Sequence, residues 1–393
     1  MDKPINKNKR ELYKVALAVI LFYFLFLGLK LYQNHFDISR FILFGDKVVS
    51  KEVALQGNYV LPNSKGYDGQ FYYRLALAPF TNEKTAFGIT LDQPLRQQRI
   101  LYPLLSRIFS FGNQRILPFA MFFVNILSLL LLIWLSPKLI EDKKQSKWLV
   151  ILIPIFPTFL ISITRDLTEI LSSALLLGAY LLFVKNKKYL SVLVFTLAAL
   201  ARETTLIFPI VLALYSFGLF LKNKNKEELI KSILFSVPFI IFAIWQIILY
   251  RIWGQSSLSV DTGLNIVWPF QGFIKAFSFK NVNEVLKVFE IIYLFIVIFL
   301  GAINFKKIHD WPLKISWALY VFLFTLYSKW IWKDDLNFFR ACTELFIFSF
   351  ILIISGDNKK AKKLIFWLTV LMTILMTIKI YLIGHWPLTI GIF

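Results

Sequence analysis

The sequence is poor in the residues from which disulfides, zinc sites and nucleotide-binding loops are built. Its 393 residues include one cysteine, Cys342, which cannot form an intramolecular disulfide. The three histidines, His35, His309 and His385, are too far apart in the sequence to give a zinc-binding spacing. No glycine is followed by lysine, so a Walker A loop is absent and direct use of ATP is not expected.

Acidic residues are also scarce. There are 23 Asp and Glu against 44 Lys and Arg, which gives a formal net charge of +21. A charge of this size is compatible with nucleic-acid binding. Here, however, the lysines lie in short clusters between apolar runs, which is the pattern of the cytoplasmic loops of a membrane protein. We therefore expect membrane lipid, and no nucleic acid, among the partners.

Apolar residues are abundant instead, at 58% of the chain, and they form long blocks. Many blocks approach the ~20 residues that a helix needs to cross a ~30 Å hydrocarbon core. No ~10-residue segments of alternating hydrophobicity occur, so the spans are expected to be helices. The sequence thus predicts an all-α polytopic membrane protein, with residues 1–393 forming a single integral membrane domain of about eleven transmembrane helices. The predicted spans are 14–32, 115–136, 148–164, 167–185, 189–201, 204–221, 231–251, 286–304, 312–329, 341–355 and 362–383.

The distribution of lysine predicts the orientation of these spans. Every second connection is rich in basic residues, and six such segments carry 23 of the 44 Lys and Arg. The positive-inside rule places them, and the N-terminus, in the cytoplasm. The stretch from Val15 to Leu31 is too long for a signal-peptide core, so we expect a retained first span. The predicted cytoplasmic segments are 1–14, 137–147, 185–188, 222–231, 305–314 and 356–363.

The extracytoplasmic side then receives one long segment, 33–114, together with smaller ones at 164–168, 201–204, 252–285 and 330–340 and the tail after residue 383. Connections longer than ~12–15 residues are usually functional or disordered, and this composition is not typical of disorder. Two stretches are amphipathic: Gly69 to Ala78, which is followed by Pro79, and Ile100 to Phe111. We expect both to form interfacial helices along the membrane surface.

The candidate site residues come from charged positions on this same side, where arginines accompany carboxylates. The segment GYDGQFYYRLA contains Asp68 with Tyr67, Gln70 and Tyr72 close by. A carboxylate beside an amide and aromatic rings is typical of a sugar-binding site. The alternative is that Asp68 only caps the helix that follows it.

Two further motifs lie where predicted spans begin. RDLTE contains Arg165, Asp166 and Glu169, at a helix N-terminus that favours an anion. Its alternative is an internal Arg165–Glu169 pair. Asp166 and Glu169 have the i,i+3 spacing of residues that share a helix face. ARETT contains Arg202 and Glu203, which are sequence neighbours and therefore point apart, so each needs a partner elsewhere, in a ligand or in the protein.

A fourth motif is WIWKDDLNFFRA, which contains Lys333 and Arg340. The tryptophans at a span end are typical of interfacial anchors. Asp334 and Asp335 could bind a divalent cation, but no D-x-D triplet supports a metal site, so no cofactor is assigned. The candidate substrate-binding residues are Tyr67, Gln70, Tyr72, Arg99, Arg165, Asp166, Glu169, Arg202, Glu203, Lys333 and Arg340.

With these motifs assembled, the chain resembles the GT-C superfamily of membrane glycosyltransferases, in particular bacterial mannosyltransferases and lipid A sugar transferases. The resemblance runs from the first span to about residue 221, so that 1–221 forms a GT-C-like module and 222–393 a set of variable helices. It rests on GYDGQFYY, QRILYPLL, RDLTE and ARET. In many relatives the carboxylate follows the first span closely, whereas here about 35 residues intervene, which suggests an inserted element at 33–66.

The resemblance implies an inverting transfer of a sugar from a polyprenyl-phosphate donor to a glycan, lipid or protein acceptor. It places the reaction on the extracytoplasmic face of a bacterial inner membrane. Asp68 matches the family's loop carboxylate, which deprotonates the acceptor hydroxyl. Arg99, Arg165 and Arg202 become candidates for holding the lipid phosphate.

Two other functions are compatible with parts of the pattern. A lipid-linked glycan polymerase or ligase also uses extracytoplasmic arginines and a large loop. A lipid or sugar transporter usually carries its charges near the bilayer midplane between internal repeats. In this chain the charges lie at one end of the predicted spans, and no repeat is apparent.

Overall fold

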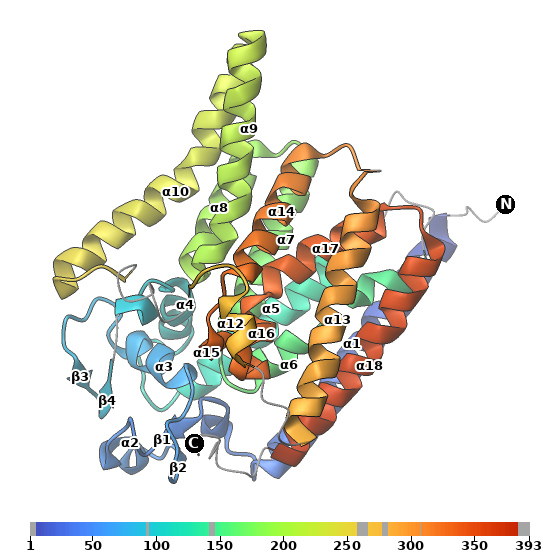
Figure 1. Cartoon of the computed structure of the whole chain (residues 1–393). Coiled ribbons are helices and arrows are strands. Elements are labelled where there is room, and N and C mark those ends of the chain that lie inside the picture. The colour runs from blue at the N-terminus through green and yellow to red at the C-terminus, as the bar shows by residue number, and fades with distance from the viewer. Residues whose placement is uncertain are drawn as a thin grey trace.

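A computed structural model describes residues 5–91, 94–140, 146–257, 266–276, 282–306 and 308–383. These residues are mostly helical, and strand occurs only in two short two-stranded sheets (Figure 1). This composition agrees with the predicted all-α membrane class. Parts of predicted segments 137–147 and 252–285, and the tail after residue 383, lie outside the described residues.

Six of the described helices are long and apolar enough to cross a membrane. Their exposed faces carry large apolar side chains such as Phe24 and Leu25 of the first helix and Ile244 and Ile248 of the fourth. Contiguous exposed apolar surface of this kind is typical of contact with lipid. The six helices lie within α1 (Ile5–Gln33), α5 (Leu117–Leu135, continued by η3, Ser136–Leu139), α9 (Ile207–Asn223, preceded by η5, Glu203–Leu206), α10 (Lys226–Trp253), α13 (Val282–Phe305) and α18 (Lys359–Ile383).

Four further predicted spans are shorter helices, and one is broken. The broken span is predicted at 148–164, where the structure has a 3₁₀ segment, η4 (Lys147–Leu152), followed by the separate helix α6 (Pro157–Ile163). The reason is local, because Pro154 and Pro157 lack the N–H that a continuous helix needs there. The number of helices that cross the membrane therefore stays a prediction. The shorter helices are α7 (Glu169–Val184), α8 (Lys188–Ala201), α14 (Trp311–Thr325) and α17 (Thr343–Ser355).

Helix α17 lies at the centre of the bundle, where it packs against α7, α13 and α14 (Figure 1). Residues 343–354 are all buried. A group of aromatic rings fills the space around its first half: the centroid of Phe156 is 4.0 Å from that of Phe346, and Tyr293 stacks on Phe346 at 5.6 Å. The start of α17 is therefore held in a densely packed core.

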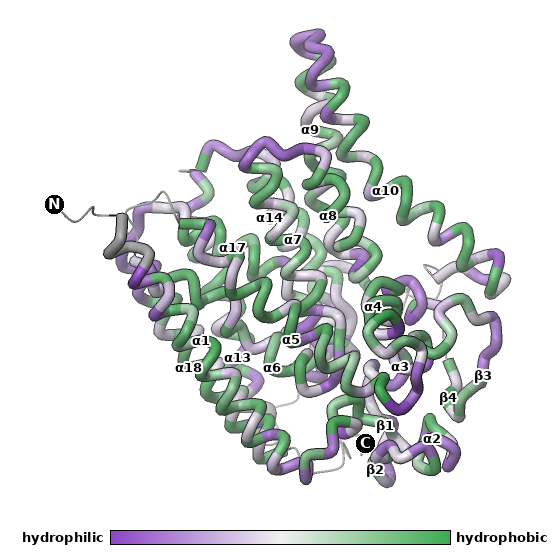
Figure 2. The backbone as a smooth tube through the Cα atoms, turned by 180° about the vertical axis from the view of Figure 1, so that it is seen from behind, coloured by the Kyte–Doolittle hydropathy of each residue, from purple (hydrophilic) through white to green (hydrophobic). Residues whose placement is uncertain are grey.

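The lysine-rich connections gather on one side of the molecule. In Figure 1 the α9–α10 turn and the first turns of α1 and α18 lie toward the top and right. The segment from η1 to α4 lies at the lower left. Figure 2 shows the α9–α10 turn and the connection into α14 as hydrophilic, with apolar helices between the two sides. The structure thus separates the two predicted loop sets, while the assignment of one side to the cytoplasm stays a prediction.

The predicted long segment folds into short elements that pack against each other. Both predicted amphipathic helices form, as α3 (Gly69–Leu77) and α4 (Leu101–Phe109). Residues 33–66 add a small unit in which β1 pairs in parallel with β2. Its elements are η1 (Ile38–Phe41), β1 (Phe44–Gly45), α2 (Lys51–Leu55) and β2 (Val60–Leu61), and the rest of the segment contributes β3 (Thr85–Ala86), β4 (Ile89–Thr90) and η2 (Pro94–Arg96).

Three short helices complete the described fold on the same side as this segment (Figure 1). They are α12 (Gln271–Ala276), α15 (Lys329–Lys333) and α16 (Asp335–Ala341). Of the two tryptophans interpreted as interfacial anchors, Trp330 is exposed, but Trp332 is buried. The ring centroid of Trp332 lies 4.9 Å from that of Phe324 and 5.1 Å from that of Phe273. The anchor interpretation was therefore wrong for Trp332, which belongs to the core.

Candidate active site around Asp68

The position of Asp68 is set by the glycine that follows it. A Cβ on Gly69 would lie 2.4 Å from the carbonyl oxygen of Arg165 and 2.7 Å from that of Ile42. Only glycine allows the start of α3 to approach these two backbone segments so closely. The motif GYDG is thereby brought onto the turn between α6 and α7, which carries RDLTE.

The Asp68 side chain forms ion pairs with two arginines and does not cap α3. One carboxylate oxygen contacts Arg96, and the other accepts a hydrogen bond of 3.0 Å from Nη2 of Arg340. Its backbone is helical and its side chain makes no capping bond, so the helix-cap alternative was wrong. Burial alone would raise the pKa of Asp68, but the charges of Arg96 and Arg340 hold it well below its usual value. Asp68 is thus ionised, and its side chain keeps 20% of its surface exposed.

Arg340 connects Asp68 to a buried ionic network at the start of α7. Its Nε donates to Glu169 at 2.9 Å, and Glu169 also lies 3.4 Å from Nη1 of Arg202. Arg202 in turn lies 3.3 Å from Glu344 and donates to the backbone carbonyl of Arg340 at 2.7 Å. Removing one partner of a buried ion pair typically costs about 3–5 kcal/mol. The network therefore locks together α7, the α8–η5 junction, α16 and α17.

The structure corrects two predictions about the RDLTE motif and places both charges of the ARETT motif. Glu169 pairs with Arg340 and Arg202, so the internal Arg165–Glu169 pair does not form. Asp166 and Glu169 do not share a helix face, because α7 begins only at Glu169 and Asp166 has a φ of 47°. Arg202 is 4% exposed, and its guanidinium is enclosed by Glu169, Glu344 and the backbone carbonyl of Arg340. The expectation that Arg202 and Glu203 point apart is confirmed.

Glu203 pairs with Arg99 in a two-pronged geometry. Nε and Nη2 of Arg99 donate to the two carboxylate oxygens at 2.9 and 2.5 Å, while Nη1 lies 3.5 Å from the hydroxyl of Tyr72. Such bidentate pairs combine charge attraction with fixed orientation. Arg99, Tyr72 and Glu203 are thereby held together beside the Asp68 network, at the junction of the loop segment and α8.

Arg165 differs from the other arginines of the cluster. Its guanidinium lies 5.4 Å from the ring centroid of Tyr67, and Arg340 lies 5.1 Å from the same ring. Nη1 of Arg165 donates to the hydroxyl of Thr164 at 3.0 Å, while its buried Nε has no hydrogen-bond partner. Within the described part of the chain no carboxylate forms an ion pair with Arg165. Tyr67 itself is oriented by a 2.9 Å hydrogen bond from its hydroxyl to Asn337.

Two predicted site residues lie outside this cluster. The buried amide of Gln70 accepts from the backbone of Gly45 at 3.2 Å and donates to the carbonyl of Lys65 at 2.9 Å. Gln70 therefore ties the 33–66 unit to α3. Lys333 is exposed, and no described contact joins its side chain to the cluster.

The described residues provide no ready set of ligands for the divalent cation that Asp334 and Asp335 suggested. Among the described residues no three His, Cys, Asp or Glu side chains gather as a metal site would require. The carboxylate of Asp334 instead accepts the backbone N–H of Leu336 at 3.1 Å, as the N-cap of α16.

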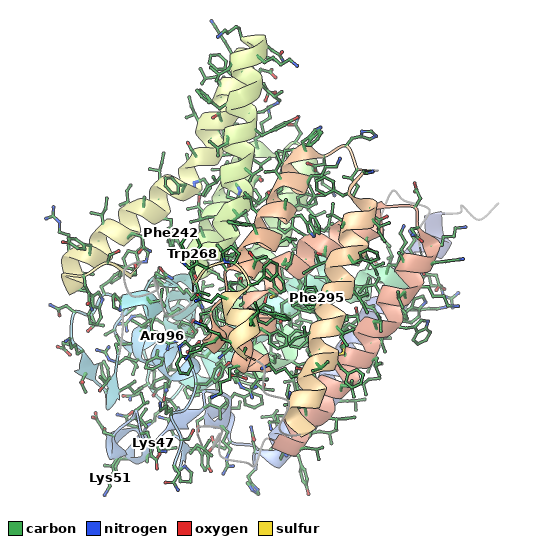
Figure 3. The ribbon with its side chains drawn as sticks, in the orientation of Figure 1. Lys47, Lys51, Arg96, Phe242, Trp268 and Phe295 are labelled. Carbon is green, nitrogen blue, oxygen red and sulfur yellow. The ribbon has the colours of Figure 1, made fainter. Side chains whose placement is uncertain are left out.

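The sequence interpretation missed several members of the cluster. Arg96 was passed over in favour of Arg99, although of these two arginines it is Arg96 that forms an ion pair with Asp68. Glu344 and Asn337 complete the contacts of Arg202 and Tyr67. Figure 3 shows Arg96 inward of Lys47 and Lys51, which lie at the outer edge of the loop segment. An available signal was that Arg96 lies in the same short stretch as Arg99.

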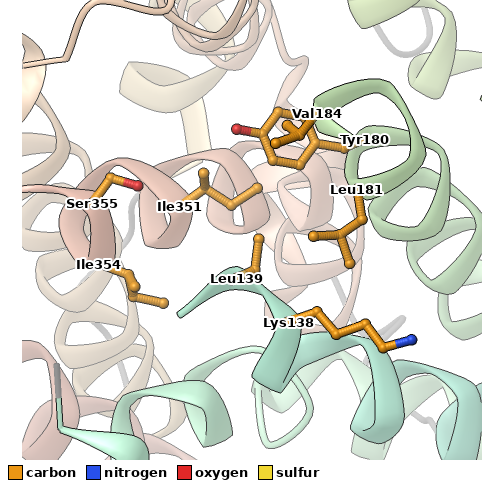
Figure 4. A pocket seen from close by; sticks show the side chains of 8 residues that line it. All are labelled: Lys138, Leu139, Tyr180, Leu181, Val184, Ile351, Ile354 and Ser355. Carbon is orange, nitrogen blue, oxygen red and sulfur yellow. The ribbon is translucent and has the colours of Figure 1, made fainter. Parts of the chain in front are cut away.

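A separate cavity of about 150 Å³ lies among η3, α7 and α17, away from Asp68 (Figure 4). It lies beside Lys138, in a predicted cytoplasmic segment, and at the opposite end of α7 from Glu169. It is therefore not part of the ionic cluster. Its lining residues are Lys138, Leu139, Tyr180, Leu181, Val184, Ile351, Ile354 and Ser355.

Comparisons of the chain with models of known protein families, with curated proteins and with solved structures found no match.

Proposed function

We propose that this chain is an inverting membrane glycosyltransferase of the GT-C type. It moves a sugar from a polyprenyl-phosphate donor to an acceptor on the extracytoplasmic face of a bacterial inner membrane. One observation carries the proposal. The ionised Asp68 of GYDG is joined by Arg340 to Glu169 of RDLTE and, through it, to Arg202 of ARET. The separate motifs of the resemblance thus meet at one place.

In this proposal Asp68 is the general base. An ionised, partly exposed carboxylate can take the proton of an acceptor hydroxyl, a role that typically contributes 10²–10⁴-fold. The acceptor oxygen forms a bond to the anomeric carbon as the bond from that carbon to the phosphate oxygen breaks. The polyprenyl phosphate leaves with the electron pair, and attack from the opposite face inverts the configuration. Arg96 and Arg340 hold the carboxylate in place through both of its oxygens.

Arg165 is the best-suited contact for the phosphate that departs. It is partly exposed, lies on Tyr67 beside Asp68 and has no carboxylate partner among the described residues. Charge that develops on a leaving oxygen is stabilised most by donors that are already oriented. Arg202 and Glu169 are buried and act through Arg340, so they position the site without contacting the substrate.

The test replaces Asp68 with Asn in a strain that lacks the native copy. Lipid-linked sugars and envelope glycans are compared by mass spectrometry, with membrane protein levels measured in parallel. We expect D68N to accumulate normally and to restore no transfer, because an amide cannot accept the proton. The matched control is D357N, since Asp357 is exposed just before α18, in the predicted cytoplasmic segment 356–363. Full transfer by D68N would exclude the general-base role, and loss of a polymer in place of a single sugar would favour a polymerase.

A further inference from the structure

One buried carboxyl group beside the cluster has no part in the proposed reaction. Asp166 follows Arg165 in the turn between α6 and α7, is fully buried and adopts a left-handed backbone with a φ of 47°. Aspartate and asparagine tolerate this conformation better than other side chains do. The backbone therefore accounts for a short polar residue here, but not for the surroundings of its carboxyl group.

These surroundings do not suit a charged carboxylate. Oδ1 of Asp166 lies 3.3 Å from the amide nitrogen of Asn125 and 3.4 Å from the hydroxyl of Tyr102. That hydroxyl also lies 3.1 Å from the carbonyl of Met121, and its single proton cannot serve both. Oδ2 has no hydrogen-bond partner, and among the described residues no cation pairs with Asp166. A buried charge without a partner is strongly unfavourable.

The neighbouring amide has the complementary deficit. Oδ1 of Asn125 is also buried without a donor. A single proton on Asp166 corrects both deficits, because the acid O–H can donate to the Asn125 carbonyl while the Asn125 amide donates back. We propose that Asp166 is a neutral carboxylic acid paired in both directions with Asn125, and that this pair positions the turn that carries Arg165. In agreement, burial raises the pKa of Asp166 to about 8.

The pair links α5 to the turn between α6 and α7. The preceding residue, Arg165, places its carbonyl against the start of α3 and its guanidinium on Tyr67. A turn held by Asp166 and Asn125 thus sets where Asp68 and Arg165 lie relative to each other. Asp166 acts as a positioning residue in this arrangement, because it does not reach the open part of the cluster.

Few titratable groups face this pair. From α4 the hydroxyl of Tyr102 touches it, and the ring of Tyr72 from α3 packs against Tyr102 with centroids 5.8 Å apart. From α7 the nearby charge is Glu169, which is already paired with Arg340 and Arg202. The side chain that α5 contributes is Asn125 itself, which is uncharged. The carboxyl group of Asp166 is therefore the group that ionises in this pair.

The first test is infrared spectroscopy of the purified full-length protein in lipid nanodiscs, from about pH 6 to about pH 10 around the raised pKa. We expect a protonated-carboxyl C=O band at the lower pH that is lost in D166N and disappears in the wild type with a midpoint near 8. D357N is the control and should leave the band unchanged. Absence of any D166N-sensitive acid band at about pH 6 would overturn the proposal.

A second variant tests the pairing in case D166N fails to fold. Asn125→Leu removes the partner but keeps the acid, so the C=O band of Asp166 should move to higher frequency as its hydrogen bonds are lost. An unchanged band would show that Asn125 is not the partner. Neither spectrum depends on sugar transfer, so failure here is distinguishable from failure of the proposed reaction.

The pair also predicts a pH dependence of stability with a definite sign. The folded pKa of about 8 lies above the ordinary value of 3.8, so the contribution of Asp166 is complete below 3.8 and is lost as the pH rises through about 8. D166N keeps the hydrogen-bonding pattern without a titrating proton. In thermal unfolding it should be about as stable as the wild type near pH 4 and should lack the decline in stability that Asp166 causes in the wild type from there to about pH 8. An identical decline in both proteins would contradict the assignment.

Discussion

At the scale of single residues, the cluster depends on the planar guanidinium group of arginine and not only on its positive charge, which lysine would also carry. Arg340 reaches Asp68 through Nη2 and Glu169 through Nε, so two edges of one planar group hold two carboxylates. Lysine offers a point charge on a flexible chain and cannot reproduce this fork. The sequence already separated arginines from the lysine-rich segments. The reason for the separation becomes apparent only from these contacts.

Arg340→Lys should therefore reduce transfer by about 10²-fold or more, because Asp68 loses its orientation while the charge is retained. Thermal unfolding should show a loss of about 1–3 kcal/mol from the buried side of the network. Sugar transfer is measured in the complemented deletion strain and unfolding in detergent. The matched control is R251K, since Arg251 is exposed near the end of α10. Wild-type transfer by R340K would show that charge alone suffices at this position.

At the scale of elements, close backbone packing sets the site as much as side-chain chemistry does. The start of α3 touches the α6–α7 turn because Gly69 has no side chain. That turn follows α6, which is short because the predicted span 148–164 is broken before Pro157 and which ends at Ile163. Hydrophobicity predicted the apolar segment correctly but not the break, because prolines interrupt a helix without lowering its apolar character.

Gly69→Ala should disrupt the site although alanine is small and favours helix. The added methyl group would meet two backbone carbonyl oxygens, which cannot move aside cheaply. We expect a loss of about 1–3 kcal/mol or more, with a strong reduction in transfer. Gly28→Ala is the control, because nothing lies within 4 Å of its Cβ position on an exposed face of α1. Equal behaviour of the two variants in unfolding and transfer would contradict the close approach.

At the scale of the whole molecule, the two sets of connections lie on opposite sides. The ionic cluster is on the side of the 33–114 segment, and the lysine-rich turns are on the other (Figures 1 and 2). The proposed donor presents its sugar on the extracytoplasmic face, which is the side predicted for the cluster. The proposed reaction therefore depends on which side faces the cytoplasm.

Cysteine labelling of intact cells tests this orientation. Lys51 lies exposed in the loop segment and Lys224 lies exposed in the α9–α10 turn. We expect Lys51→Cys to react with a membrane-impermeant maleimide and Lys224→Cys to react only after permeabilisation. The native Cys342 is buried and should give little background. Labelling of Lys224→Cys in intact cells, with Lys51→Cys protected, would reverse the orientation and remove the basis for an extracytoplasmic reaction.

The sequence alone determined the helical membrane class, the alternation of basic connections and the motifs that carry candidate site residues. These follow from composition along the chain, since hydrophobicity and charge act locally on each segment. Only the tertiary structure decided which charges become partners: Asp68 meets Arg340 across 272 residues, and Glu169 meets it across 171. It also decided that Arg202 is buried and that Asp166 faces Asn125. Such pairings depend on how distant helices pack, because the position of a charged residue in the sequence does not indicate which distant residue will pair with it.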